Sequence, residues 1–149
     1  MHRSPRRASP RLVRVCVVTT ILMLSLGGLA PTARATTSAE QAVYALINDA
    51  RANVGVRPLK LSERLSRIAH RHSRQMAINR YLFHSCLTCI GGSSLGENVG
   101  YGADYQIVQG KLMASTPHRA NILAKKFRRV GVGVVRRGGL AWVTQIFVG

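Results

Sequence analysis

Apolar residues recur every three or four positions in two segments of this 149-residue chain, which is the spacing of a helix with one buried side. The first segment predicts a helix over residues 39–53, which Gly55 and Pro58 bring to an end. The second predicts a helix that begins after a capping Ser62 and ends near Asn79. The apolar sides consist of Val43, Leu46, Ile47 and Ala50 in the first helix and of Leu65, Ile68, Ala69 and Met76 in the second. Each helix therefore has one side that can pack against a core.

Two shorter helices are predicted further along the chain. Asp104 can cap the third helix, because its side chain can accept a hydrogen bond from one of the free backbone N–H groups of the first turn. Thr116 followed by Pro117 has the form of an N-cap and a first helical residue. The fourth helix is therefore predicted to start there and to end at Leu123.

A β-hairpin is predicted at the end of the chain. Residues 130–135 and 140–148 are apolar runs joined by the turn Arg136-Arg137-Gly138-Gly139. Residues 81–102 contain many glycines and serines and are predicted to form a long loop, which in a small domain usually has a function or is held by a cross-link. Helices first and a hairpin last predict an α+β fold.

The first 35 residues have the pattern of a signal peptide. An arginine-rich stretch precedes an apolar run over residues 15–30, and small residues precede a predicted cleavage between Ala35 and Thr36. The run is shorter than the roughly 20 residues that span a bilayer, so a retained membrane anchor is the weaker alternative. We therefore expect a secreted protein with a single domain over residues 36–149. The mass of the exported protein checks this expectation, because a chain that keeps residues 15–30 would indicate the anchor instead.

Residues 36–149 are strongly basic. They hold 16 of the 22 Lys and Arg and all five acidic residues, so their formal charge is +11. Such a surface favours contact with anionic partners such as cell-envelope polymers and lipid headgroups. Nucleic-acid recognition is disfavoured, because the chain has no zinc-finger spacing and few aromatic residues that could stack on bases.

Cys86 and Cys89 are the two cysteines that remain once the predicted signal peptide is removed. An even count in an exported chain favours a disulfide between them, which would hold the long loop. Free thiols are the first alternative. Metal or redox chemistry is the second, and it is weaker because no partner motif lies nearby in the sequence.

Five segments of the chain carry distinctive residues in a fixed order. Three contain the candidate site residues and read Phe83-His84-Ser85, Gly96-Glu97-Asn98-Val99-Gly100-Tyr101-Gly102 and Pro117-His118-Arg119-Ala120-Asn121-Ile122-Leu123. The other two run from Phe127 to Val134 and from Trp142 to Phe147. Together they resemble the CAP superfamily, the secreted proteins that include cysteine-rich secretory proteins, venom antigens and plant pathogenesis-related proteins. The likeness is to the bacterial single-domain members and covers the chain from about Glu40 to its end.

The resemblance implies a fold and a site. The fold is an α/β/α sandwich, with helices around a small, mainly antiparallel sheet that includes a strand near residues 96–99. The site is a central cleft with two His and two Glu, and the resemblance places His84, Glu97 and His118 on three of these positions. The fourth position falls near Ser115, and a serine cannot replace a carboxylate as a base or an anionic ligand. The incomplete set weakens the case for catalysis.

His84, His118 and Glu97 are the candidate metal ligands. Two imidazoles and one carboxylate can form an open zinc site with water as the fourth ligand. The sequence leaves open whether Glu97 ligates the metal, accepts a hydrogen bond from an imidazole or acts as a base. In the alternative without a metal, Glu97 and Asn98 hydrogen-bond backbone groups of the loop. His72 lies on the apolar side of its helix and is expected to be a hydrogen-bonded core residue, with at most a supporting role behind the ligands.

Three functions remain at this point. The first is a secreted CAP module that binds a small ligand, a lipid or sterol, or a divalent metal such as zinc. The second is a metal-assisted, peptidase-like hydrolase that uses Glu97 as its base. The third is a cationic surface-binding or antimicrobial protein that needs no site. The incomplete His and Glu set favours the first.

Overall fold

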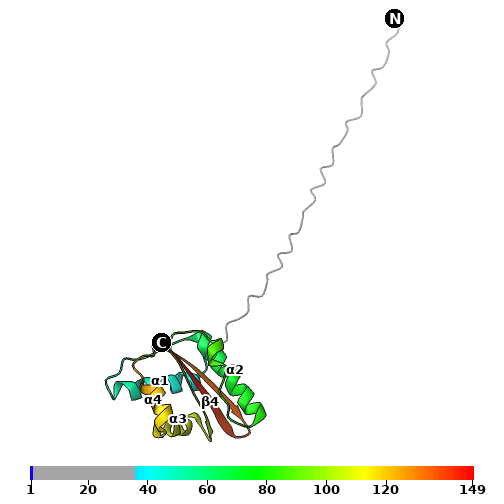
Figure 1. The fold of residues 1–149 in the computed structure, drawn as a ribbon. Coiled ribbons are helices and arrows are strands. Elements are labelled where there is room, and N and C mark those ends of the chain that lie inside the picture. The colour runs from blue at the N-terminus through cyan, green and yellow to red at the C-terminus, as the bar shows by residue number, and fades with distance from the viewer. Residues whose placement is uncertain (2–35) are drawn as a thin grey trace. The chain divides into compact units, whose positions relative to one another are not determined.

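The computed structural model describes Met1 and residues 36–149, so the rest of the predicted signal peptide lies outside the described residues (Figure 1). A four-stranded sheet in the order β1-β3-β4-β2 lies at the centre of the domain. The strands are β1 Lys60–Leu61, β2 Leu95–Gly102, β3 Arg129–Arg137 and β4 Leu140–Val148. β1 is parallel to β3, and the other neighbours are antiparallel. The sheet is therefore mainly antiparallel, as the resemblance implies.

β3 and β4 form the predicted hairpin, with a shorter turn than the sequence predicts. β3 continues through Arg137, which pairs with Leu140, so only Gly138 and Gly139 lie between the two strands. Their φ angles are 60° and 73°. A two-residue hairpin turn of this kind needs positive φ at both positions, and glycine adopts such angles without strain.

The edge strand β2 corrects the prediction of a loop over residues 81–102. That prediction is wrong for residues 95–102, which pair along β4. The strand near residues 96–99 that the resemblance implies is confirmed. A Cβ on Gly96 would lie 2.8 Å from the ring of Phe127, so the strand needs a residue without a side chain there. Its pairing and close packing hold it in the sheet, although glycine has a low intrinsic preference for strands.

Within residues 36–149, four α-helices and one short 3₁₀ helix surround the sheet. They are α1 Ser38–Ala52, α2 Glu63–Asn79, α3 Tyr105–Ala114, α4 Thr116–Leu123 and the 3₁₀ helix η1 Leu87–Cys89. Ser62 and Asp104 cap α2 and α3 as predicted. The predicted cap of α4 is one residue too late, because Ser115 both ends α3 and caps α4. The Ser115 hydroxyl makes no capping hydrogen bond and instead bonds the side chain of His118.

The helices cover both faces of the sheet (Figure 1). α2 lies so close to β3 on one face that a Cβ on Gly131 or Gly133 would fall 2.2 Å from the helix backbone. α1, α3 and α4 pack on the other face and form the main core with β3 and β4; its central residues include Val43, Ile47, Val108, Leu112, Ile122, Val132, Val143 and Phe147. The α/β/α sandwich is therefore confirmed. Within residues 36–149, no helix has both the length and the apolar character that crossing a bilayer requires.

Arg51 connects α1 to the end of α4 inside the domain. Its side chain is fully buried. It donates hydrogen bonds to the backbone oxygens of Arg57 at 2.8 Å, Ile122 at 2.7 Å and Ala124 at 3.1 Å. Burial lowers the pKa of the Arg51 guanidinium, and the nearby charges of Arg57 and Arg128 lower it further. These bonds hold the C-terminal end of the helix that carries His118.

Candidate functional site

Glu97 lies on the edge strand β2 and holds the segment that contains His84. Its side chain is fully buried, whereas the side chain of His84 is 63% exposed. Nδ1 of His84 lies 2.8 Å from Oε2 of Glu97, and the backbone N–H of Ser85 donates to the same oxygen at 2.9 Å. The Ser85 hydroxyl donates to Oε1 at 2.6 Å. A carboxylate only accepts hydrogen bonds, so His84 donates from Nδ1, and in the neutral imidazole its Nε2 is the nitrogen with the free lone pair.

His118 lies in the first turn of α4 and is held by Ser115. Nδ1 of His118 lies 2.8 Å from the Ser115 hydroxyl oxygen. The expected second glutamate position therefore carries a hydroxyl that binds the histidine itself. A hydroxyl can donate or accept, so this contact occupies Nδ1 without assigning its proton. Nε2 is the ring nitrogen of His118 that this bond leaves unused.

Asn98 and Asn121 connect the two histidine segments through the edge strand. Asn98 follows Glu97 in β2 and donates from Nδ2 to the backbone oxygen of His118 at 3.0 Å. Asn121 on α4 donates to Oδ1 of Asn98 at 3.0 Å and to the backbone oxygen of Glu97 at 3.3 Å. Neighbouring residues of one strand thus hold the two segments, Glu97 by its side chain and Asn98 by its amide.

His72 supports the same region from α2. It is buried, with 4% of its surface exposed. Its Nε2 lies 2.7 Å from the backbone oxygen of Phe83, and its ring meets the Phe83 ring edge-on. His72 is therefore a hydrogen-bonded core residue, as expected, and it positions the residue that precedes His84.

Cys86 and Cys89 are joined by a disulfide that spans η1, with their Cα atoms 5.4 Å apart. The predicted disulfide between the two cysteines is therefore present. The cross-link lies in the loop that follows His84 and Ser85. It limits the conformations of the segment that Glu97 binds.

A cavity of about 300 Å³ lies beside His118. Its lining includes Ser115, Leu82, Val99 and Leu112, whereas His84 is not among its lining residues. The walls are mostly apolar, and His118 and Ser115 supply polar groups on one side. Such a cavity suits a small, largely apolar ligand.

The three candidate ligands do not form one cluster. Among residues 36–149, no group of three or more His, Cys, Asp or Glu side chains is arranged to hold a metal ion. Both oxygens of Glu97 already accept hydrogen bonds. Of the roles left open for Glu97, its contacts match acceptance of a hydrogen bond from an imidazole. They also match the alternative without a metal, because Glu97 accepts from the backbone N–H of Ser85 and Asn98 donates to the backbone oxygen of His118. Sequence reasoning missed Ser85 as its partner, although the position of Ser85 directly after His84 was a usable signal.

The comparisons with known proteins agree with this architecture. The family model of the cysteine-rich secretory protein family (CAP) matches residues 44–147. The protein YkwD of Bacillus subtilis (strain 168) is 33% identical over 123 residues, which cover 74% of this chain and 47% of YkwD.

Several solved structures resemble the domain. An extracellular protein containing a SCP domain from Bacillus anthracis str. Ames has a TM-score of 0.63 and 27% identity, over 73% of this chain and 39% of that one. NaASP2, solved with Zn²⁺, has a TM-score of 0.64 at 12% identity over 80% of this chain and 83% of that one, and it shows a likeness of fold alone. The chain spans about half of YkwD and less than half of the Bacillus anthracis protein. The family match over residues 44–147 and the identity to YkwD show that this chain belongs to the cysteine-rich secretory protein (CAP) family.

Proposed function

We propose that residues 36–149 form an exported CAP module that binds a divalent metal ion such as zinc through Nε2 of His84 and of His118. The observation that carries the proposal is the pairing of each Nδ1 at 2.8 Å, with Glu97 for His84 and with Ser115 for His118. A ligating histidine usually has its other ring nitrogen held in this way, because the bond orients the ring. Export is supported by the extracellular relative. NaASP2, which shares the fold at 12% identity, was solved with Zn²⁺.

The donor set fits a weak, open metal site better than a closed structural one. Two imidazoles supply two ligands, and water would complete the coordination. A bound ion would lower the pKa of such a water. Glu97 is poorly suited to act as the base of a hydrolase, because its side chain is fully buried and both of its oxygens accept hydrogen bonds. We therefore favour binding over hydrolysis.

Zinc titration by calorimetry tests the metal proposal. We expect His84→Ala and His118→Ala each to weaken zinc binding by at least about tenfold, because each removes one of two ligands. Glu97→Gln should weaken it by roughly 10- to 100-fold while leaving measurable binding, because it removes the carboxylate that orients His84. Binding should also weaken as the pH falls, since protons compete with the ion for the imidazole nitrogens.

His70→Gln is the matched control. Its Nδ1 bonds Glu40 at 2.9 Å, and a glutamine amide can keep a donor there, so zinc affinity should not change. Circular dichroism confirms that each variant is folded. Equal zinc affinity in the wild type and in the His84→Ala, His118→Ala double variant would refute the proposal.

A basic groove favours a second function, binding to phosphate-bearing surfaces of the cell envelope. Arg57, Lys60, Arg128 and Arg129 line a cavity of about 440 Å³, and no acidic residue is among its lining residues. Burial lowers the pKa of Arg51 most, and the positive charges of the nearby Arg57 and Arg128 lower it further. Positive charges that converge in a groove attract anionic groups more strongly than charges spread over a surface do.

Vesicle sedimentation tests this second function. We expect more binding to vesicles with phosphatidylglycerol than to pure phosphatidylcholine, and a loss of binding as salt screens the charges. Arg128→Gln with Arg129→Gln should reduce binding several-fold. The control pair Arg67→Gln with Arg71→Gln removes the same charge from α2, and neither residue lines the groove. Equal losses in both pairs would indicate net charge alone and would contradict a dedicated groove.

A further inference from the structure

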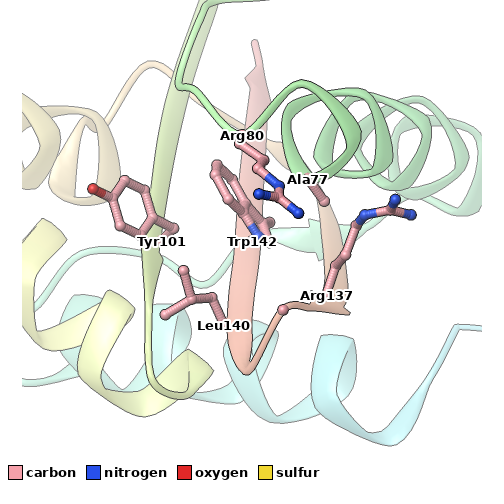
Figure 2. A pocket seen from close by; sticks show the side chains of 7 residues that line it. Ala77, Arg80, Tyr101, Arg137, Leu140 and Trp142 are labelled. Atoms are coloured by element: carbon pink, nitrogen blue, oxygen red, sulfur yellow. The ribbon is translucent and has the colours of Figure 1, made fainter.

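A third cavity, of about 600 Å³, lies at the end of the sheet near the hairpin turn. Figure 2 shows it between the C-terminal end of α2, the tip of the hairpin and the edge strand β2. Its lining includes Ala77, Arg80, Tyr101, Arg137, Leu140 and Trp142. Neither His84 nor His118 lines it, so it is a different place from the proposed metal site.

The wall of this cavity is apolar and aromatic. Trp142 is 4% exposed and Ala77 is 1% exposed, so both belong to the core. The rings of Trp142 and Tyr101 pack with their centroids 4.9 Å apart and their planes at 30°. The indole Nε1 of Trp142 is buried and has no acceptor among the described residues. A buried donor without an acceptor is unfavourable, but this atom is covered by protein and does not reach the surface of the cavity.

Two arginines line the same cavity. Arg80 comes from the end of α2 and Arg137 from the end of β3, and Figure 2 shows both side chains at the cavity. Neither guanidinium makes a hydrogen bond or an ion pair within residues 36–149, and no acidic residue is among the lining residues. Both side chains are exposed, and two positive charges at one cavity raise the local positive potential, which attracts an anion. Guanidinium groups bind carboxylates and phosphates through paired N–H donors.

The backbone conformation of Arg80 is a further sign that this cavity has a function. Arg80 ends α2 with φ 59° and ψ 30°. It is the one non-glycine residue with positive φ among the described residues. Glycine is the usual residue in this left-handed position, because a side chain there is strained. Departures from such local rules are concentrated at functional sites, and here the departure places a guanidinium at the cavity.

We propose that this cavity binds a small organic anion whose carboxylate or phosphate lies between Arg80 and Arg137 and whose flat apolar body packs against Trp142. The charge requirement comes from the two unpaired guanidinium groups. The apolar requirement comes from the aromatic and aliphatic wall. One ligand should have both an anionic group and an apolar body, because the arginines and the apolar wall line the same cavity.

The fluorescence of Trp142 reports on this cavity directly, since it is the only tryptophan of the chain. The full chain is titrated with phenyl phosphate, phenylacetate, inorganic phosphate and the neutral benzyl alcohol. We expect a saturable change in emission with the two aromatic anions, and at least tenfold weaker binding of inorganic phosphate and of benzyl alcohol. The comparison of phenyl phosphate with phenylacetate decides between phosphate and carboxylate. Benzyl alcohol that binds as tightly as phenyl phosphate would overturn the charge requirement.

Three variants localise the binding. Arg80→Gly removes the guanidinium and relieves the backbone strain, so we expect at least tenfold weaker binding together with an unchanged or higher thermal midpoint. Arg137→Gln should weaken binding to a similar extent. Arg136→Gln removes the same charge from the preceding residue of β3. Arg136 does not line the cavity, so this variant should leave the affinity unchanged. Equal affinity in the wild type and in the Arg80→Gly, Arg137→Gln double variant would overturn the proposal, as would a wild type without saturable binding.

Discussion

Gly133→Ala is expected to lower the free energy of unfolding by about 3 kcal/mol, at the upper end of what added atoms in a packed interior usually cost. A Cβ at this position would lie 2.2 Å from the backbone carbon of Ala69 and from the backbone nitrogen of His70. A helix backbone cannot move aside as the end of a flexible side chain can. α2 would have to shift away from β3, and with it His72, which holds Phe83 before His84.

Urea unfolding measures this effect, and Gly110→Ala is its matched control. Gly110 is exposed inside α3, and a Cβ there would meet nothing within 4 Å. Because alanine favours helices more than glycine does, Gly110→Ala should raise the free energy of unfolding by about 0.5–1 kcal/mol. If Gly133→Ala, like Gly110→Ala, does not lower the free energy of unfolding, the close contact between α2 and β3 does not exclude a side chain at residue 133.

Arg51→Met is expected to lower the free energy of unfolding by about 3 kcal/mol, because it leaves three backbone oxygens without their charged donor. Methionine has similar length and suits the buried surroundings, so the lost hydrogen bonds dominate the change. One nitrogen of Arg51, Nη2, is already buried without a partner among the described residues. The wild-type arginine therefore carries the cost of one unpaired donor. Its replacement removes that cost, so the loss of stability should be smaller than the sum of three hydrogen bonds.

The same unfolding measurement separates the role of Arg51 from charge alone. Arg57→Met removes a nearby positive charge from an exposed side chain and should change stability by less than about 0.5 kcal/mol. Hydrogen exchange gives a local readout, since Arg51→Met frees the end of α4 and should speed the exchange of its amide protons. A loss in Arg51→Met no greater than in Arg57→Met would show that the bonds to Ile122 and Ala124 add nothing.

Local signals in the sequence predicted most of the fold. The periodic apolar residues and the caps at Ser62 and Asp104 predicted α2 and α3, because a helix depends on neighbours three or four positions apart. The hairpin followed from two apolar runs around glycines. The resemblance added the sandwich and the strand near residues 96–99. These features depend on a few residues close together in the chain, so they can be read without the tertiary structure.

Contacts between distant segments decided what the sequence left open. β1 is two residues long and exists because it pairs with β3, and the full length of β2 depends on β4. A glycine-rich segment has no period that would reveal a strand, so pairing and packing decide its conformation.

The same division applies to the site. The motifs selected His84, Glu97 and His118 by residue type. Only the folded chain decided that Glu97 would accept hydrogen bonds from the His84 segment and that Ser115 would bond His118. The cavity that Arg80 and Arg137 line has no sequence signal at all. Its residues come from elements far apart in the chain, and their proximity results from the packing of α2 against the sheet.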